Sequence, residues 1–342
     1  MNSANNKKAS GQSMTIRKIA EDLNLSTSTV SRALSDNYQI SSATKKRVKK
    51  YAADINFTVN KFASGLRDGK TQTIGVVVCS IDSSFITQII NGIYDHCNDT
   101  GYQFLVMQSR GSFTSEQNCV KMLVGNRVDG LLISPSFDST DLTYLKNLQE
   151  TGFPVVLFDR ISDQIQTHKI AVDNSGGAFK AAQYLLDQNI KRTLVINCKQ
   201  EVFLSRERLN GFLKAMKYSG IEQREELIAH CDPSNPEVLQ AQLTRLFTEN
   251  FINHHHAEAI FTTTDSFTTT AIKVLNKLGL KVPLAGFCNS DLADIFSGQP
   301  TTIYQPAYEL GKLAAKQLLS LIKNKEEDFE TVYLPTKLIV RS

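Results

Sequence analysis

Two short helical patterns joined by a polar turn lie near the start of this 342-residue chain and constrain its fold more than any other feature. In the first pattern, apolar residues recur at the spacing i, i+3, i+4, i+7, namely at Ile16, Ile19, Ala20 and Leu23. The second pattern covers residues 27–34, and Ser26 before it can accept a free backbone N–H as an N-cap. Residues 14–34 therefore predict a helix-turn-helix.

The outward face of the second predicted helix carries small hydrogen-bonding groups and one cation: Thr27, Ser28, Ser31 and Arg32. Hydroxyl groups and a guanidinium can reach base edges and phosphates in a major groove, so this face favours DNA binding. The alternative at this point is an ordinary helical hairpin whose polar face is simply solvated.

The next segment predicts a third helix with a basic face. Ser41 or Ser42 can cap a helix over residues 44–55, which carries five Lys and Arg residues between positions 45 and 50. Residues 1–70 contain 13 Lys and Arg against 5 Asp and Glu, a net charge of +8, whereas residues 71–342 contain 25 against 29, a net charge of −4. A basic run is often only a solvated face, but this asymmetry favours a polyanionic partner and salt-dependent binding.

At this point the chain resembles a known family. The segments T-I-R-K-I-A (15–20) and L-S-T-S-T-V-S-R-A-L (25–34) look like the headpiece of the lactose/galactose repressor (LacI/GalR) family. The resemblance implies a DNA-binding headpiece over residues 14–58 and a hinge over 59–70. Residues 1–13 are polar, and we expect them to form a disordered tail. In that family the hinge forms a short helix on DNA and inserts a leucine into the minor groove.

The hinge resembles the family with two departures. Leu66 falls at the wedge leucine and Ala63 at the small residue between paired hinge helices, whereas Val59 replaces the usual proline and Ser64 the usual arginine. Without the resemblance, a plain linker residue would be the preferred interpretation of Leu66. We expect the following residues to contact DNA: Thr15, Thr27, Ser28, Ser31, Arg32, Asn60, Ala63 and Leu66.

Composition excludes several other classes of protein. The sequence has no run of eighteen apolar residues, and its polar first 13 residues lack the apolar segment of a secretory signal, so we expect a cytoplasmic protein. The six cysteines form no C-x-x-C pair and are expected to be free thiols. His254, His255 and His256 lack the spacing of a metal site, and a solvated loop is the simpler interpretation. We expect neither a cofactor nor a metal.

The body of the chain alternates predicted strands and helices. Strands are predicted at Ile74–Cys79, Gln103–Met107, Leu131–Ser134, Val155–Phe158, from Ile170, and near Leu194–Asn197, Leu227–His230, Ala259–Phe261 and Leu284–Phe287. Helices between them indicate two successive βαβ series, which means two doubly wound lobes. No glycine-rich dinucleotide motif and no phosphate-binding loop occurs.

This body also resembles the family, whose core is like a periplasmic binding protein. The resemblance rests on V-D-G-L-L-I-S-P (128–135), V-D-N-S-G-G-A (172–178), R-E-R-L-N-G-F (206–212) and T-T-I-Y-Q-P-A-Y-E-L-G (301–311). It implies a core over 71–342, with lobe 1 at about 71–171 and 303–324 and lobe 2 at about 172–302 and 325–342. The chain would then cross between the lobes near Val172, Thr302 and Asn324, with the ligand site at the strand ends.

Residues for the effector site are carried over from the family, where strand-end side chains touch the ligand: Phe85, Asp159, Arg208, Asp265, Cys288, Asn289 and Gln305. Carboxylates and a forked guanidinium suit the hydroxyl groups of a sugar or sugar derivative, although each residue alone could equally be a cap or a local ion pair. The family usually has G-F-D-D where this chain has G-F-C-N (286–289). Since a thiol is a poor hydroxyl acceptor, the effector differs from a common hexose or Asn289 substitutes. The stretch 283–286 is also shorter than usual.

Two functions compete on sequence grounds. The first is a DNA-binding transcriptional regulator, expected to be a repressor, that is controlled by a small carbohydrate-like effector. It would act as a homodimer on a pseudo-palindromic operator, without a leucine-heptad tail for a tetramer. The second is a sugar-binding or sugar-processing protein with an incidental basic head. The second needs an export signal or catalytic residues, and no local catalytic signature is found, so we expect no enzyme.

Overall fold

The computed structural model describes the chain in several stretches: residues 15–57, 70–136, 139, 141–199, 203–254, 256–290, 293, 300–324 and 328–341. Contacts divide the chain into two compact units, Met1–Thr71 and Gln72–Ser342, which we call the headpiece and the core. The expected tail and most of the expected hinge, including Asn60, Ala63 and Leu66, lie outside the described residues.

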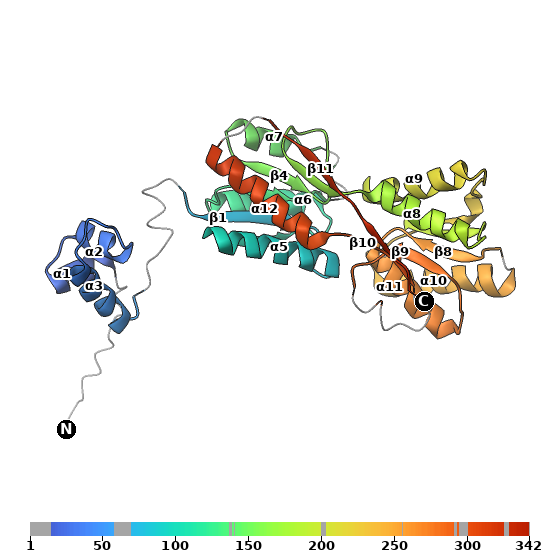
Figure 1. The fold of residues 1–342 in the computed structure, drawn as a ribbon, viewed down its shortest axis with the longest axis horizontal. Coiled ribbons are helices and arrows are strands. Elements are labelled where there is room, and N and C mark those ends of the chain that lie inside the picture. Colours follow the sequence, from blue (N-terminus) through green and yellow to red (C-terminus); the bar gives the residue numbers. More distant parts are fainter. Residues whose placement is uncertain are drawn as a thin grey trace, which may run out of the picture. The chain divides into compact units, whose positions relative to one another are not determined.

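The described part of the headpiece, residues 15–57, contains three helices, α1 (Ile16–Leu23), α2 (Thr27–Leu34) and α3 (Ser42–Asp54) (Figure 1). Each begins after a hydroxyl side chain that accepts a backbone N–H, at Thr15, Ser26 and Ser41. Asn24 ends α1 in the left-handed conformation, with φ of 51°, which allows the tight turn into α2. The buried core is small: Ile19, Ala20, Leu23, Val30, Ala33, Val48 and Ala52.

Lobe 1 of the core is built on a parallel six-stranded sheet with the order β11-β5-β4-β3-β1-β2. Its strands are β1 (Thr73–Val78), β2 (Gln103–Gln108), β3 (Leu131–Ile133), β4 (Val155–Phe158), β5 (Lys169–Val172) and β11 (Thr331–Leu334). Helices α5 (Ser84–Thr100) and α12 (Ala307–Asn324) pack on one face. Helices α6 (Phe113–Gly125) and α7 (Thr143–Glu150) pack on the other, so the inner strands are buried on both sides.

Lobe 2 repeats this plan with the order β12-β10-β9-β8-β6-β7, in which β12 is antiparallel (Figure 1). Its strands are β6 (Thr193–Cys198), β7 (Ile228–Cys231), β8 (Ala259–Thr262), β9 (Leu284–Phe287), β10 (Thr301–Tyr304) and β12 (Lys337–Ile339). Helices α8 (Asn174–Asp187) and α9 (Phe203–Tyr218) cover one face. Helices α10 (Pro236–Phe247) and α11 (Asp265–Leu278) cover the other.

The chain passes between the two sheets three times, and one crossing differs from expectation. It passes from β5 into α8 and from β10 into α12, near the expected crossings at Val172 and Thr302. The third crossing, expected near Asn324, instead falls between β11 and β12, at residues 335–336. The expectation was wrong because β11 adds to the open edge of lobe 1, where Val332 pairs with Ile170.

Close helix packing inside each lobe depends on glycine. A Cβ atom at Gly92 of α5 would overlap the carbonyl oxygen of Tyr308 in α12, and one at Gly311 of α12 would overlap that of Ile89 in α5. In lobe 2, a Cβ at Gly211 of α9 would overlap the carbonyl oxygen of Ser175 in α8. These two helix pairs therefore approach backbone to backbone.

No helix within the described residues combines the length and the apolar character needed to cross a membrane.

Candidate ligand site and nucleic-acid interface

The outer face of α2 presents the residues that the sequence singled out. Thr27, Ser28 and Arg32 are exposed, while Val30 and Ala33 on the opposite side are buried against α1 and α3. The first turn is held by Ser26, whose hydroxyl accepts the Thr29 backbone N–H at 3.1 Å and lies 2.8 Å from the Ser28 hydroxyl. Arg32 lies one turn further along the same helix. The result is a rigid helix start with hydroxyl groups and one cation free to face a ligand.

Two further residues predicted to contact DNA, Ser31 and Thr15, are partly buried or already hydrogen-bonded. Ser31 is only half-buried, on the same helix. Thr15 is exposed but serves as the N-cap of α1, where its hydroxyl accepts the Lys18 backbone N–H at 3.3 Å. The O–H of the same hydroxyl group can still donate to a phosphate oxygen.

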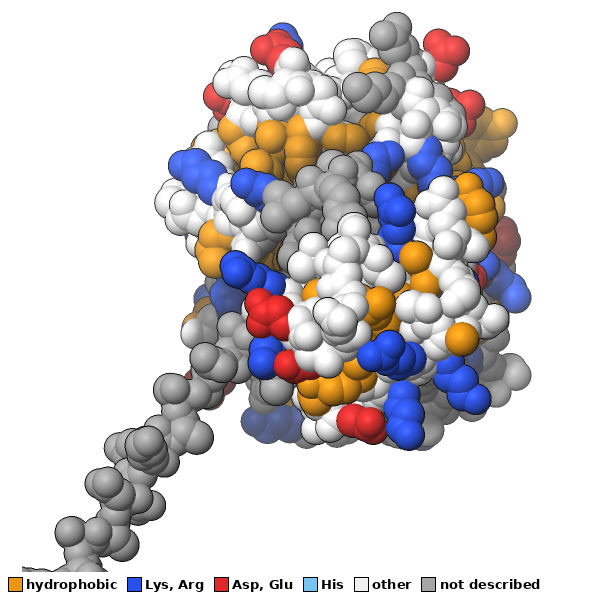
Figure 2. Space-filling view, turned by 90° about the vertical axis from the view of Figure 1, so that its left-hand side faces the viewer, with side chains coloured by type: hydrophobic (Ala, Val, Ile, Leu, Met, Phe, Trp, Pro, Cys, Tyr) orange, Lys and Arg blue, Asp and Glu red, His pale blue; other side chains and the backbone are white. Residues whose placement is uncertain are grey.

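The basic face of α3 is partly used inside the headpiece. Lys45 and Lys49 form ion pairs with Asp36, at 3.2 and 3.1 Å, and hydrogen bonds from both lysines lower the pKa of that carboxyl group. Arg47 donates to the carbonyl oxygen of Leu23 at 3.0 Å, which ties α3 to the end of α1. Much of the predicted phosphate-binding run thus stabilises the three-helix fold. Figure 2 shows Lys and Arg side chains spread over the face of the molecule that it draws, with Asp and Glu side chains among them.

In the core, Asp159 stands directly after β4 of lobe 1. Its backbone is left-handed, with φ of 61°, and its side chain is buried. One carboxylate oxygen accepts the Ser134 hydroxyl at 3.1 Å, whereas Oδ1 has no hydrogen-bond partner among the described residues. Burial raises the pKa of this carboxyl group, and the nearby Arg160 and Arg208 oppose the rise. A buried, strained acid with one free oxygen is a candidate for ligand contact.

Arg208 of α9, in lobe 2, interacts electrostatically with Asp159. Its guanidinium donates to Asn174 Oδ1 at 2.7 Å, to the Thr263 carbonyl at 2.8 Å and to Gln305 Oε1 at 2.6 Å. It also lies 3.7 Å above the centre of the Phe287 ring. Burial lowers its pKa to about 10, although the carboxylates of Asp159 and Asp265 oppose this shift.

Asp265 at the start of α11 explains the unusual Cys288. Burial raises the pKa of the Asp265 carboxyl group. Hydrogen bonds from the Cys288 thiol and the Asn289 backbone N–H oppose this rise. Burial also raises the pKa of the Cys288 thiol to about 12, so it remains a donor. A second acid at position 288 would place two carboxylates in contact. The Oδ1 atom of Asp265 has no partner among the described residues.

Asn289 and Gln305 form the centre of a buried amide network. The Asn289 side chain donates to the Gln305 carbonyl oxygen at 2.7 Å and accepts the Gln305 backbone N–H at 3.0 Å. It also donates to Gln88 Oε1 at 2.8 Å, although the two residues are 201 positions apart in the chain. The sequence analysis missed Gln88, because a polar residue on a helix carries no local sign of a distant partner.

The structure does not join Phe85 to this network. Phe85 is buried in the hydrophobic core that α5 and α12 form on the lobe 1 sheet. The six polar candidates therefore gather around Arg208 and Asn289. Phe85 contributes one apolar side chain at the beginning of α5, one turn before Gln88.

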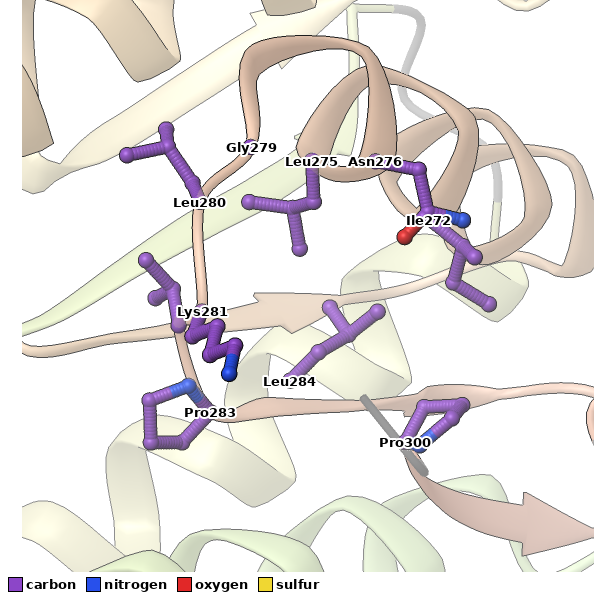
Figure 3. Close-up of a pocket in the computed structure, with 10 residues that line it drawn as sticks. Ile272, Leu275, Asn276, Gly279, Leu280, Lys281, Pro283, Leu284 and Pro300 are labelled. Carbon is purple, nitrogen blue, oxygen red and sulfur yellow. The ribbon is translucent and has the colours of Figure 1, made fainter. Parts of the chain in front are cut away.

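A separate cavity of about 540 Å³ lies in lobe 2 (Figure 3). It is bounded by the end of α11, the loop at 279–283, the start of β9 and Pro300. Figure 3 shows mainly apolar side chains directed towards it, among them Leu275, Leu280 and Leu284. None of the predicted effector residues lines it.

The histidine run does not form a metal site in the described part of the chain. The rings of His254 and His256 stack at 5.2 Å, and His255 lies outside the described residues. Among the described residues, no three His, Cys, Asp or Glu side chains are grouped so that they could hold a metal ion. The described cysteines are free thiols, and Cys198 and Cys231 lie side by side on β6 and β7.

Comparison with known families matches both units. Residues 15–60 match the family "Bacterial regulatory proteins, lacI family", and residues 74–326 match the family "Periplasmic binding protein domain". The chain is similar to the HTH-type transcriptional repressor PurR of Photobacterium profundum, with 28% identity over 96% of this chain and 97% of the relative. The corresponding repressor of Vibrio vulnificus is also 28% identical, with the same coverage.

Solved structures share the fold over nearly the whole chain. The Lac repressor dimer bound to operator and the anti-inducer ONPF has a TM-score of 0.83 with 21% identity, covering 96% of this chain and 98% of that one. The transcriptional regulator CelR in complex with cellobiose has a TM-score of 0.70 with 24% identity, covering 96% and 99%. At these identities the likeness concerns the fold alone.

Proposed function

We propose that this chain, which belongs to the lactose/galactose repressor (LacI/GalR) family of transcriptional regulators, is a repressor released from or recruited to its operator by a sugar-like effector. The family match and the full-length relatives make it a DNA-binding regulator with an effector-binding core rather than an enzyme. The nature of the effector, the contact residues, the homodimer and a cytoplasmic location are our proposals.

We infer that Thr27, Ser28 and Arg32 read the operator. They are exposed at the start and on the outer face of α2, and the buried side of that helix is fixed by the headpiece core. A good base contact is worth roughly 1–3 kcal/mol. Thr15 and Ser31 are proposed as supporting contacts to the DNA backbone, where they would add affinity without sequence preference.

The test compares operator variants. Thr27→Ala combined with Ser28→Ala should weaken binding to the preferred operator and flatten the preference among variants at the base pairs these residues touch. Ser42→Ala, at the exposed start of α3, is the matched control and should leave that preference intact. Unchanged preference in the α2 double variant would exclude these residues from base recognition.

The observation that carries the effector proposal is a set of buried polar atoms without partners. Asp159 Oδ1 and Asp265 Oδ1 are buried and unpaired among the described residues. Both carboxylates interact electrostatically with Arg208, which donates three of its five N–H groups to protein acceptors. Two acceptors beside one cation suit a neutral ligand with several hydroxyl donors.

This chemistry favours a sugar or sugar derivative. Hydroxyl groups of the ligand would donate to the two free carboxylate oxygens and accept the remaining guanidinium N–H groups. The cationic Arg160 and Arg208 balance the two acids, so the ligand need carry no charge. CelR, which is similar in fold, was solved with cellobiose, so a core of this fold can hold a disaccharide.

A thermal-shift screen of mono- and disaccharides against the full chain would identify the effector. Arg208→Ala should then abolish both the thermal shift and the effect of that sugar on operator affinity, while operator binding without sugar persists. Arg192→Ala is the matched control, because Arg192 is also paired with an acid, Glu258 at 3.0 Å, on the surface of the same lobe. A normal sugar response in the Arg208 variant would refute this assignment.

We also propose a homodimer on a pseudo-palindromic operator. The edge strand β2 exposes Leu105 and Val106, and exposed apolar side chains lie on the neighbouring helices at Tyr94 and Met122. Such a group is unfavourable in water unless another surface covers it. Light scattering at micromolar concentration should give twice the chain mass, whereas a monomer with and without DNA would refute the proposal.

A further inference from the structure

The side chain of Gln88 joins the two lobes by hydrogen bonds through both its amide oxygen and its amide nitrogen. Its Oε1 accepts from Asn289 Nδ2 at 2.8 Å, and its Nε2 donates to the Asn289 backbone carbonyl at 3.2 Å. Gln88 belongs to α5 of lobe 1, whereas Asn289 follows β9 of lobe 2. The contact is therefore a two-point bridge between the lobes.

The bridge requires a neutral amide at position 289. The Asn289 side chain uses both N–H groups as donors, to Gln88 Oε1 and to the Gln305 carbonyl, and its oxygen accepts from the Gln305 backbone N–H. A carboxylate of the same shape has no N–H group and would face two carbonyl oxygens at hydrogen-bonding distance. Because Asn289 is buried, water cannot relieve that repulsion.

The bridge is also connected to the candidate ligand site. Gln305, which Asn289 holds, accepts a hydrogen bond from Arg208 at 2.6 Å through its own side chain. The polar path therefore runs from Gln88 of lobe 1 through Asn289 and Gln305 to Arg208. Asp159 and Arg208 lie in different lobes, so their separation depends on the orientation that this bridge maintains.

We propose that Gln88 and Asn289 are positioning residues that latch the two lobes in the orientation in which Asp159 and Arg208 interact. The role in ligand response rests on the proposed function, but the latch itself can be tested without any ligand. Breaking it should release the lobes to other orientations. The loss of a single net hydrogen bond changes such an equilibrium by about fivefold, and Gln88 makes two.

The test measures the distance between lobes in the ligand-free full chain. Spin labels at Lys146→Cys on α7 and Tyr218→Cys on α9 occupy exposed sites in lobe 1 and lobe 2. Cys79→Ser removes the half-buried native thiol, and dilution with unlabelled chain leaves one labelled copy per assembly. The parent should give one dominant distance. Gln88→Leu, which keeps the volume and removes both hydrogen bonds, should add a second population.

Two further variants make the result decisive. Gln223→Leu removes a glutamine hydrogen bond to the Thr193 carbonyl inside lobe 2, so it should keep the parent distribution. Asn289→Asp should also add the second population, and it should lower the thermal unfolding midpoint, because its buried carboxylate also faces the Gln305 carbonyl oxygen. The midpoint of Gln88→Leu should stay near that of the parent, since each lobe keeps its own core. A parent-like distance distribution in Gln88→Leu overturns the latch. A parent-like distribution in Asn289→Asp overturns the requirement for a neutral amide. Neither result bears on the sugar proposal.

Discussion

The headpiece and the core build their candidate sites in opposite ways. In the headpiece, the proposed DNA-reading residues lie on one eight-residue helix, and its cap and buried side are local. In the core, the polar residues around Arg208 come from both lobes and from the segment after β10 that passes between them. Hydrogen-bonded partners in this network are up to 201 positions apart in the chain. The headpiece site keeps its geometry as long as the small headpiece core stays folded. The core site also depends on how the two lobes are oriented.

The comparison is tested most severely by removing equal amounts of buried side chain from each unit. Ile19 of the headpiece and Ile89 of the core are both fully buried, and truncation of either to Ala costs about 2–5 kcal/mol. A headpiece with so small a core has little stability to lose. Ile19→Ala should therefore weaken operator binding about tenfold or more.

Ile89→Ala supplies the control, because the larger core should remain folded and operator binding should persist at the same temperature. Hydrogen exchange of headpiece and core peptides in the full chain measures both effects. Equal loss of operator binding in the two variants would contradict the assumption that the headpiece is the less stable unit.

A second, smaller effect concerns the start of α2. Ser26→Ala removes the cap that accepts the Thr29 N–H, which typically costs about 1 kcal/mol. In a small domain that free energy corresponds to a midpoint shift of about 4–8 °C. Exchange of the headpiece amides should accelerate about fivefold, and Ser26→Asp should restore most of the protection because Asp also caps. No change in exchange would mean that the local cap is dispensable.

The smallest expected effect is a gain in stability of the core. Burial raises the pKa of Asp159, so between about pH 4 and the raised pKa the folded chain holds a proton that the unfolded chain loses. Stability from this group therefore falls as pH rises. Asp159→Asn should raise the core midpoint at pH 7 by about 2–4 °C, corresponding to about 1 kcal/mol.

The gain from Asp159→Asn should fade as pH falls towards 4, where the parent carboxyl is itself protonated. Asp99→Asn, on the exposed side of α5, is the control and should show no such pH dependence. A gain that is constant from pH 4 to 7, measured by thermal unfolding, would show that charge burial is not its cause.

Sequence patterns were sufficient where the determinants are local. The capped helices of the headpiece and the buried strands followed from periodicity and capping residues, whereas Asp159 and Asp265 were singled out by the resemblance to the family. The partners of Lys45 and Lys49 did not follow from these patterns, because Asp36 joins them only after the turn before α3 is formed. Gln88 and the true place of β11 depend on pairing between distant segments, which no local pattern encodes.

The glycine contacts between α5 and α12 have a mechanical consequence. Gln88 stands on α5 one turn before Gly92, and Gln305 lies just ahead of α12, which crosses α5 at Gly311. Two helices in backbone contact have little room to slide past one another, so we expect α5 and α12 to move as one body. An effector that displaces Gln305 should then displace Gln88 as well.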